Sequence, residues 1–212
     1  MSEGGEALRE PWESLRRQRE AAGFGMWLFL NSEALLFGGL ITAFFATRFF
    51  HPQAFAEAGR EAEVVYGTVN TLILLTSSLT MAVASHATRA ELRRLSFWSL
   101  GLTMALGFCF LVLKGLEWRS DLEKGLLPGP GFPLETPGTA LFWAFYWTLT
   151  PLHGLHLIGG IITLGLLTWQ AARGKRPLRS PAFEAAGLYW HLIDVVWIVL
   201  YPALYLQGRV SP

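Results

Sequence analysis

Apolar positions dominate five long stretches of the chain, and polar positions gather between them. The stretches cover residues 23–47, 64–87, 95–117, 138–172 and 183–207. An α-helix rises about 1.5 Å per residue, so about 20 apolar residues cross the roughly 30 Å hydrocarbon core of a bilayer. The pattern therefore predicts an all-α, polytopic membrane bundle of five transmembrane helices within residues 23–207.

Cations are distributed unequally between the two sets of polar segments. Eleven Lys and Arg residues lie in residues 1–22 and in the connections after the second and fourth stretches, whereas five lie in the remaining segments. The positive-inside rule places the richer side in the cytoplasm. We therefore expect a cytoplasmic N-terminal segment, 1–22, and an outer tail, 208–212. Lys114, three residues from the end of its stretch, is expected to snorkel outward.

Composition supports this class of protein. Hydrophobic residues make up 52% of the 212 residues, and charged residues only 16%. These proportions are typical of a polytopic membrane protein and exclude an ordinary soluble enzyme. The net charge of +1 and the lack of a basic tract give no sign of nucleic-acid binding. A single cysteine, Cys109, excludes an internal disulfide framework and a Cys-rich metal site.

Glu33 is an ionisable residue near the middle of the first stretch, which has no Lys, Arg or Asp. A charged side chain at the centre of a bilayer costs roughly 2.5–3.5 kcal/mol on insertion scales, so Glu33 must face protein, water or a partner. It is a functional-site candidate as a buried carboxylate that can take up a proton.

Other ionisable residues lie in or at the edge of the predicted spans: His86, Glu117, His153, His156, Glu184, His191 and Asp194. Glu184, His191 and Asp194 are offset by seven and three positions, which places them on one face of the last helix. That face is expected to pack inward. One interpretation is a functional polar network; the other is that these groups hydrogen-bond one another and fix how the helices pack.

The residues do not assemble a catalytic site of a known type. A carboxylate-bridged two-metal bundle needs a Glu-x-x-His motif, and none occurs. A b-type haem protein is an alternative, because histidines lie on three predicted helices. His86, His156 and His191 are however expected at different depths, which argues against axial ligation. We predict no catalytic residue and no metal site, and a subunit that supports a reaction carried out elsewhere.

Four segments, in order, resemble the cytochrome c oxidase subunit III family. They are GMWLFLNSEALLFGG, TLILLTSSLTMAVASHA, PLHGLHLIGG and AAGLYWHLIDVVWIVLYPALYL, and the match extends from about residue 23 to 206. Within them, Glu33 matches the family's carbodiimide-reactive glutamate, and His156 a histidine near bound lipid. His191 and Asp194 match polar positions of the last helix, and Glu117 a glutamate at the end of the corresponding helix.

The resemblance implies a non-catalytic subunit of a respiratory haem-copper oxidase in the bacterial inner (plasma) membrane. It implies packing on subunit I in a hetero-oligomer that also contains subunit II, with haem and copper in subunit I and no cofactor in this chain except phospholipid. Support of proton uptake and of stability during turnover is implied as well. The interhelical polar network is then expected to comprise Glu117, His153, Glu184, His191 and Asp194.

The chain departs from the long members of the family, which have seven helices. Five-helix members accompany quinol oxidases, some cytochrome c oxidases and nitric oxide reductase complexes, so an accessory role in a nitric oxide reductase is a second alternative. The family arginine that contacts lipid phosphate aligns with Gln170. Arg173, one turn further on, can replace it, which makes His156 and Arg173 the candidate lipid-binding residues.

Overall fold

The computed structural model describes residues 14–209 and contains six α-helices in that range. They are α1 (Leu15–Phe50), α2 (Pro52–Glu61), α3 (Val64–Arg89), α4 (Arg93–Glu123), α5 (Thr139–Ala172) and α6 (Pro181–Tyr205). All except α2 are long and apolar enough to cross a membrane. The predicted all-α architecture with five spanning helices is therefore confirmed.

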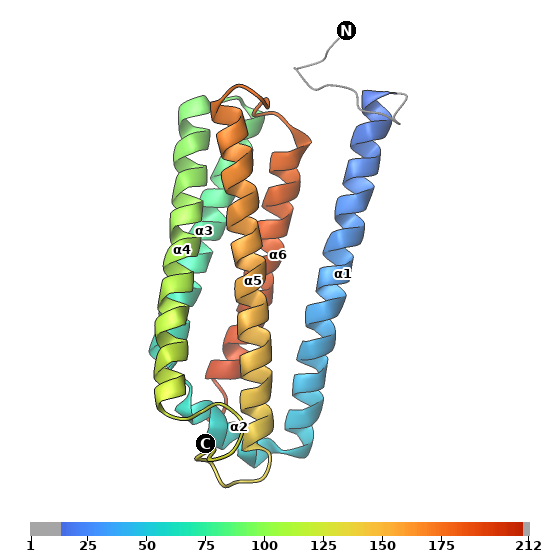
Figure 1. Ribbon diagram of the computed structural model, residues 1–212. Helices are drawn as coiled ribbons and strands as arrows, with labels where there is room; N and C mark the ends of the chain where they lie inside the picture. Colours follow the sequence, from blue (N-terminus) through green and yellow to red (C-terminus); the bar gives the residue numbers. More distant parts are fainter. Residues whose placement is uncertain (1–13, 210–212) are drawn as a thin grey trace.

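The long helices run up and down in one bundle (Figure 1). α3, α4, α5 and α6 pack closely, whereas α1 leans against one side, and its N-terminal half diverges from α6 in this view. α1 begins at one end of the bundle and α6 finishes at the other, as five crossings require. Which end faces the cytoplasm stays a prediction from the cation count.

α2 is the element that the apolar pattern missed. It is only ten residues long, starts with Pro52 and lies across the end of the bundle where α1 finishes (Figure 1). Its buried face includes Phe55, whose ring lies 5.2 Å from that of Phe44 and 5.6 Å from that of Phe142. A short helix with one apolar face has too few apolar residues to be recognised as a span.

α1 touches the bundle along one narrow stripe. Leu30, Phe37 and Phe44 are its buried apolar residues, and they recur every seven positions. Seven residues make close to two helical turns, so the three side chains lie on one face. Most other large side chains of α1 are exposed, among them Phe24, Trp27 and Leu28. α1 is therefore the least buried of the spanning helices.

Trp190 of α6 occupies the centre of the bundle because two glycines make room for it. An added Cβ at Gly107 of α4 would lie 2.9 Å from Trp190 Cη2, and one at Gly160 of α5 would lie 3.2 Å from Trp190 Cε3. The indole Nε1–H donates a hydrogen bond to Ser77 Oγ of α3 at 3.1 Å. One aromatic side chain thus joins four helices, and its fit depends on glycine at both positions.

Candidate functional site within the helix bundle

Glu33 and His156 form an ion pair between α1 and α5. Glu33 Oε2 lies 2.7 Å from His156 Nε2, and both side chains are 16% exposed. Glu33 is the nineteenth of the 36 residues in α1, and His156 is the eighteenth of the 34 in α5. Both groups are therefore near the middle of their helices, where an unpaired charge is most costly.

The hydrogen bonds of His156 determine where protons can lie in this pair. His156 Nδ1 lies 2.7 Å from the carbonyl oxygen of Leu152, which only accepts hydrogen bonds, so Nδ1 carries a proton. The contact between Nε2 and Glu33 Oε2 then holds one further proton, on either the imidazole or the carboxyl group. The pair is neutral as a unit in both arrangements. The two helices are therefore joined by a buried hydrogen bond that requires no net charge.

Aromatic side chains line the seam around the pair. The ring of Phe37 lies edge-on to His156 with its centroid 5.0 Å away. The Tyr189 hydroxyl of α6 donates to the backbone carbonyl of His156 at 3.1 Å, and its ring lies 5.6 Å from that of Phe29. These contacts hold the imidazole between α1, α5 and α6, while the remaining exposure keeps the pair accessible from the side of the bundle.

A second polar cluster lies deeper, between α4, α5 and α6. Lys114 Nζ lies 3.0 Å from Glu117 Oε1 and 3.0 Å from the Tyr146 hydroxyl, and it also donates to the Tyr205 hydroxyl. The Tyr205 hydroxyl lies 2.7 Å from Glu117 Oε1. Tyr146 reaches Asp121 Oδ2 as well, at 2.6 Å. The charged groups are completely enclosed, with Lys114 1% and Glu117 0% exposed.

The expectation that Lys114 snorkels outward was wrong. α4 continues to Glu123, so Lys114 lies nine residues before its end rather than three, and its ammonium group points inward to three partners. The sequence carried a signal for this arrangement. Lys114, Glu117 and Asp121 are offset by three and seven positions, the spacing of one helix face. Tyr146 could not be recognised as a partner of these residues, because it lies on α5 and sequence spacing does not relate positions on two helices.

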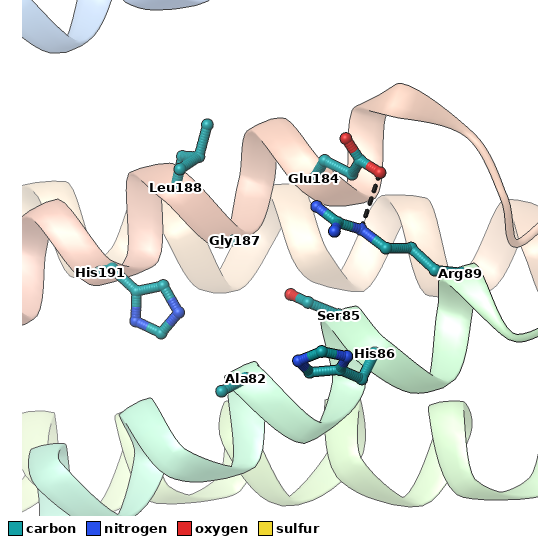
Figure 2. A pocket seen from close by; sticks show the side chains of 8 residues that line it. All are labelled: Ala82, Ser85, His86, Arg89, Glu184, Gly187, Leu188 and His191. Carbon is teal, nitrogen blue, oxygen red and sulfur yellow. Dashed lines mark ion pairs between the residues drawn. The ribbon is translucent and has the colours of Figure 1, made fainter.

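The predicted polar face of α6 meets α3. Arg89 Nε of α3 lies 2.9 Å from Glu184 Oε1, and both side chains line a pocket of about 270 Å³ (Figure 2). His191 also lines this pocket, and its Nδ1 lies 3.0 Å from Ser78 Oγ. Asp194 Oδ2 lies 3.8 Å from His191 Nδ1, beyond hydrogen-bonding range. Glu184, His191 and Asp194 therefore share the α3–α6 seam.

His153 lies apart from both polar groups. Its side chain is buried with the imidazole 5.5 Å from the ring of Phe110 and 5.0 Å from that of Trp197. Within the described chain, neither of its nitrogens has a hydrogen-bond partner. Arg173 is at the end of α5, where its guanidinium lies 4.3 Å from the ring centroid of Trp169. Among residues 14–209, no three His, Cys, Asp or Glu side chains are placed to hold a metal ion.

The bundle encloses pairs of ionisable side chains between its spanning helices. This arrangement is typical of a multi-pass helical membrane protein. A sequence profile described as cytochrome c oxidase subunit III matches residues 16–209. The chain belongs to the cytochrome c oxidase subunit III family. It is thus a subunit III of a haem-copper oxidase and one component of a complex with other oxidase subunits.

Individual relatives cover almost the whole chain. Cytochrome c oxidase subunit 3 of Bacillus subtilis (strain 168) is 35% identical over 190 residues, which are 88% of this chain and 86% of the relative. The protein of the same name from Synechocystis sp. is 36% identical over 86% of this chain and 74% of its own length. Quinol oxidase subunit 3 of Bacillus spizizenii is 32% identical over 87% of this chain and 86% of its own length.

Proposed function

We propose that this chain supports proton uptake and stability during turnover in a bacterial haem-copper terminal oxidase of the inner membrane. In this proposal it packs on subunit I, in a complex that also contains subunit II, and has no catalytic site of its own. Haem and copper belong to subunit I, and the chain itself binds only phospholipid. The observation that carries the proposal is the contact between Glu33 and His156, near the middle of α1 and α5, in which Oε2 lies 2.7 Å from Nε2.

The pair suits a role in proton supply. It holds one proton at the contact between the carboxyl and imidazole groups, and transfer within the pair leaves its total charge unchanged. With that proton in place the pair carries no net charge, whereas an isolated charge buried in the bilayer would cost several kcal/mol.

The same contact suits a role in stability. α1 is attached to the bundle through its narrow apolar stripe and through Glu33, whereas its outer face is free to meet another subunit or lipid. Because the pair fixes the middle of α1 against α5, it also fixes the surface that α1 presents. Loss of that contact is expected to loosen packing on subunit I, and the complex then inactivates sooner during turnover.

Lipid binding is proposed for the seam between α1 and α5. Arg173 supplies a cation at the end of α5, and the exposed side chains of Phe24, Trp27 and Leu28 on α1 offer apolar surface. His156 lies about 17 residues, or roughly 25 Å, further into the membrane. A phospholipid with its phosphate near Arg173 would extend its acyl chains toward His156.

The role does not depend on the electron donor. The relatives include cytochrome c oxidase and quinol oxidase subunits at similar identity, 35% and 32%. Since donor binding in both cases belongs to other subunits, the proposal concerns what this chain contributes to either complex.

The test compares Glu33→Gln with Glu33→Ala in the assembled oxidase and counts turnovers before activity is lost. Gln keeps a hydrogen bond to His156 but cannot exchange a proton with it, whereas Ala removes both. We expect normal initial oxygen reduction in both variants, a shortened active lifetime in Glu33→Ala and slower proton uptake in both. The matched control is Glu123→Gln, an exposed carboxylate at the end of α4. An unchanged lifetime and unchanged proton uptake in both Glu33 variants would refute the proposal.

A further inference from the structure

The hydroxyl group of Tyr146 lies between two carboxyl groups but has only one hydrogen to offer them. Its oxygen is 2.8 Å from Glu117 Oε1 and 2.6 Å from Asp121 Oδ2. The third neighbour of this oxygen, Lys114 Nζ at 3.0 Å, donates a hydrogen bond to it. If both carboxyl groups were ionised, one of the two short contacts would join two oxygen atoms with no hydrogen between them. A further hydrogen is therefore required in the row of oxygens from Glu117 through Tyr146 to Asp121.

The remaining donors of the cluster cannot supply that hydrogen. Lys114 directs its three N–H groups at Glu117 and at the two tyrosine hydroxyls. The Tyr205 hydroxyl accepts from Lys114 and donates its own hydrogen to Glu117 Oε1 at 2.7 Å. Every hydrogen of the ammonium group and of Tyr205 is thus already committed. The missing hydrogen must be a proton carried by one of the two carboxyl groups.

The charge of the cluster points to the same proton. One ammonium group and two carboxylates would leave a net charge of −1 in a space where Glu117 is 0% and Asp121 1% exposed. A buried charge without compensation is neutralised rather than kept. Glu117 Oε2 and Asp121 Oδ1 have no hydrogen-bond partner within the described chain, so hydrogen bonds do not offset this charge. A bound metal ion would balance the charge, but it would leave the contact at Tyr146 without its hydrogen.

Other titratable groups nearby are engaged elsewhere. Lys124, one turn beyond Asp121 on α4, lies 2.6 Å from Glu63 Oε1 in a partly exposed ion pair. His153 of α5 packs 5.0 Å from the ring of Trp197, and within residues 14–209 neither of its nitrogens has a hydrogen-bond partner. Neither side chain therefore donates to the carboxyl groups of the cluster.

We propose that Asp121 holds this proton and is a proton-binding site in the interior of the bundle. The ammonium group of Lys114 lies directly against Glu117 Oε1, at 3.0 Å, and this contact favours the ionised form of Glu117. The proton is left to Asp121, whose carboxylic acid group donates to Tyr146, and Tyr146 in turn donates to Glu117. The site is separate from the pair between α1 and α5, so it does not rest on the function proposed above.

The proton links the packing of three helices to its own presence. With the proton in place, an unbroken series of hydrogen bonds joins Asp121 and Glu117 of α4 to Tyr146 of α5 and Tyr205 of α6, near the ends of α4 and α6 (Figure 1). Without it, the cluster carries a net negative charge, and the contact between Tyr146 and Asp121 or Glu117 turns repulsive. Release of the proton is therefore expected to loosen the ends of these helices.

The test is infrared spectroscopy of the purified oxidase complex in which the side-chain carboxyl carbon of aspartate is labelled with ¹³C. We expect a carboxylic-acid C=O band of one aspartate that shifts on labelling and is lost in Asp121→Asn, whose amide still has a donor for Tyr146. Tyr146→Phe should keep the band but shift it, because the acid loses its hydrogen-bond acceptor. Glu123→Gln, at an exposed ion pair of the same helix, is the control and should leave the band unchanged.

Three results would overturn the proposal. Absence of a labelled carboxylic-acid band from the wild-type complex would show that Asp121 is ionised, and this result does not depend on the folding of any variant. A spectrum of Asp121→Asn that keeps every such band would assign them to other aspartates. A band that is insensitive to the label and disappears in Glu117→Gln would place the proton on Glu117. If Asp121→Asn does not assemble, Tyr146→Phe decides, since a band at the wild-type position would show that the acid does not bind Tyr146.

Discussion

Glu33 Oε2 and His156 Nε2 lie 2.7 Å apart, although 123 positions separate the two residues along the chain. The contact joins α1, the least buried spanning helix, to α5 at the mid-level of both. The pair therefore fixes the position of α1 against α5, and in the function proposed above it also holds a proton.

Stability and proton supply can be separated at this pair. His156→Phe leaves the Glu33 carboxyl group without its partner in a mostly buried seam, and we expect a loss of about 1–3 kcal/mol in the free energy of unfolding. Phe retains the edge-on contact with Phe37. Glu33→Leu/His156→Phe removes both polar groups and should recover most of that stability, because a matched apolar pair replaces a desolvated ion pair. Thermal unfolding of the purified complex measures both changes. Equal destabilisation by the single and double variants would contradict this interpretation.

Lys114 should be among the most sensitive positions of the chain. Lys114→Met leaves Glu117 buried without its cation, and we expect a loss of about 3–5 kcal/mol. Lys114→Met/Glu117→Gln removes both charges and keeps an oxygen that accepts the Tyr205 hydroxyl, so it should be more stable than the single variant. Lys124→Met, at a partly exposed ion pair, should cost no more than about 1 kcal/mol. Chemical unfolding in detergent measures the free energy of unfolding of the three variants. A Lys114→Met variant as stable as wild type would show that the cluster is hydrated.

Two glycines of α4 should respond in opposite ways to the same change. Gly107→Ala places a Cβ 2.9 Å from the buried ring of Trp190, which cannot move freely, and we expect about 1–3 kcal/mol of destabilisation. Gly101→Ala adds a methyl group with no atom within 4 Å and should be neutral or slightly stabilising. The difference between their unfolding temperatures is the quantity to measure. Similar effects at the two positions would mean that Trp190 repacks.

An ion pair outside the spanning segments should make stability depend on pH. Glu63, just before α3, accepts hydrogen bonds from Lys124 Nζ at 2.6 Å and Ser120 Oγ at 2.7 Å. These bonds lower the pKa of its carboxyl group below the ordinary value of 4.5. A lowered folded-state pKa stabilises the protein above the unfolded value, and this stabilisation is lost as the pH falls through the folded value.

Wild type should accordingly lose stability relative to Glu63→Gln between about pH 5 and pH 3, by no more than about 1 kcal/mol because both side chains are partly exposed. Unfolding temperatures of the two proteins across that range, with Glu123→Gln as control, give the comparison. Parallel curves for wild type and Glu63→Gln would show that the Glu63 bonds do not persist in solution.

The number of spanning helices follows from sequence because length and apolarity are local properties. The ends of the helices are not fixed in this way: α4 extends to Glu123, six residues beyond the apolar stretch, so the sequence placed Lys114 too close to a helix end. Partners across helices are harder still. Glu33 and His156 both stood out as polar residues in apolar surroundings. Helical spacing, however, relates positions on one helix only and does not give the relative height of residues on two different helices. α2 escaped detection because ten residues with one buried face resemble a loop in composition.

We propose above that Glu33 and His156 together hold a proton used by the oxidase. Proton uptake during a single turnover can be followed with a pH-indicator dye in the purified complex. We expect Glu33→Gln to slow proton uptake relative to wild type and to Glu123→Gln, while the helices stay assembled. Uptake at the wild-type rate in Glu33→Gln would contradict it and leave the pair with a purely structural role.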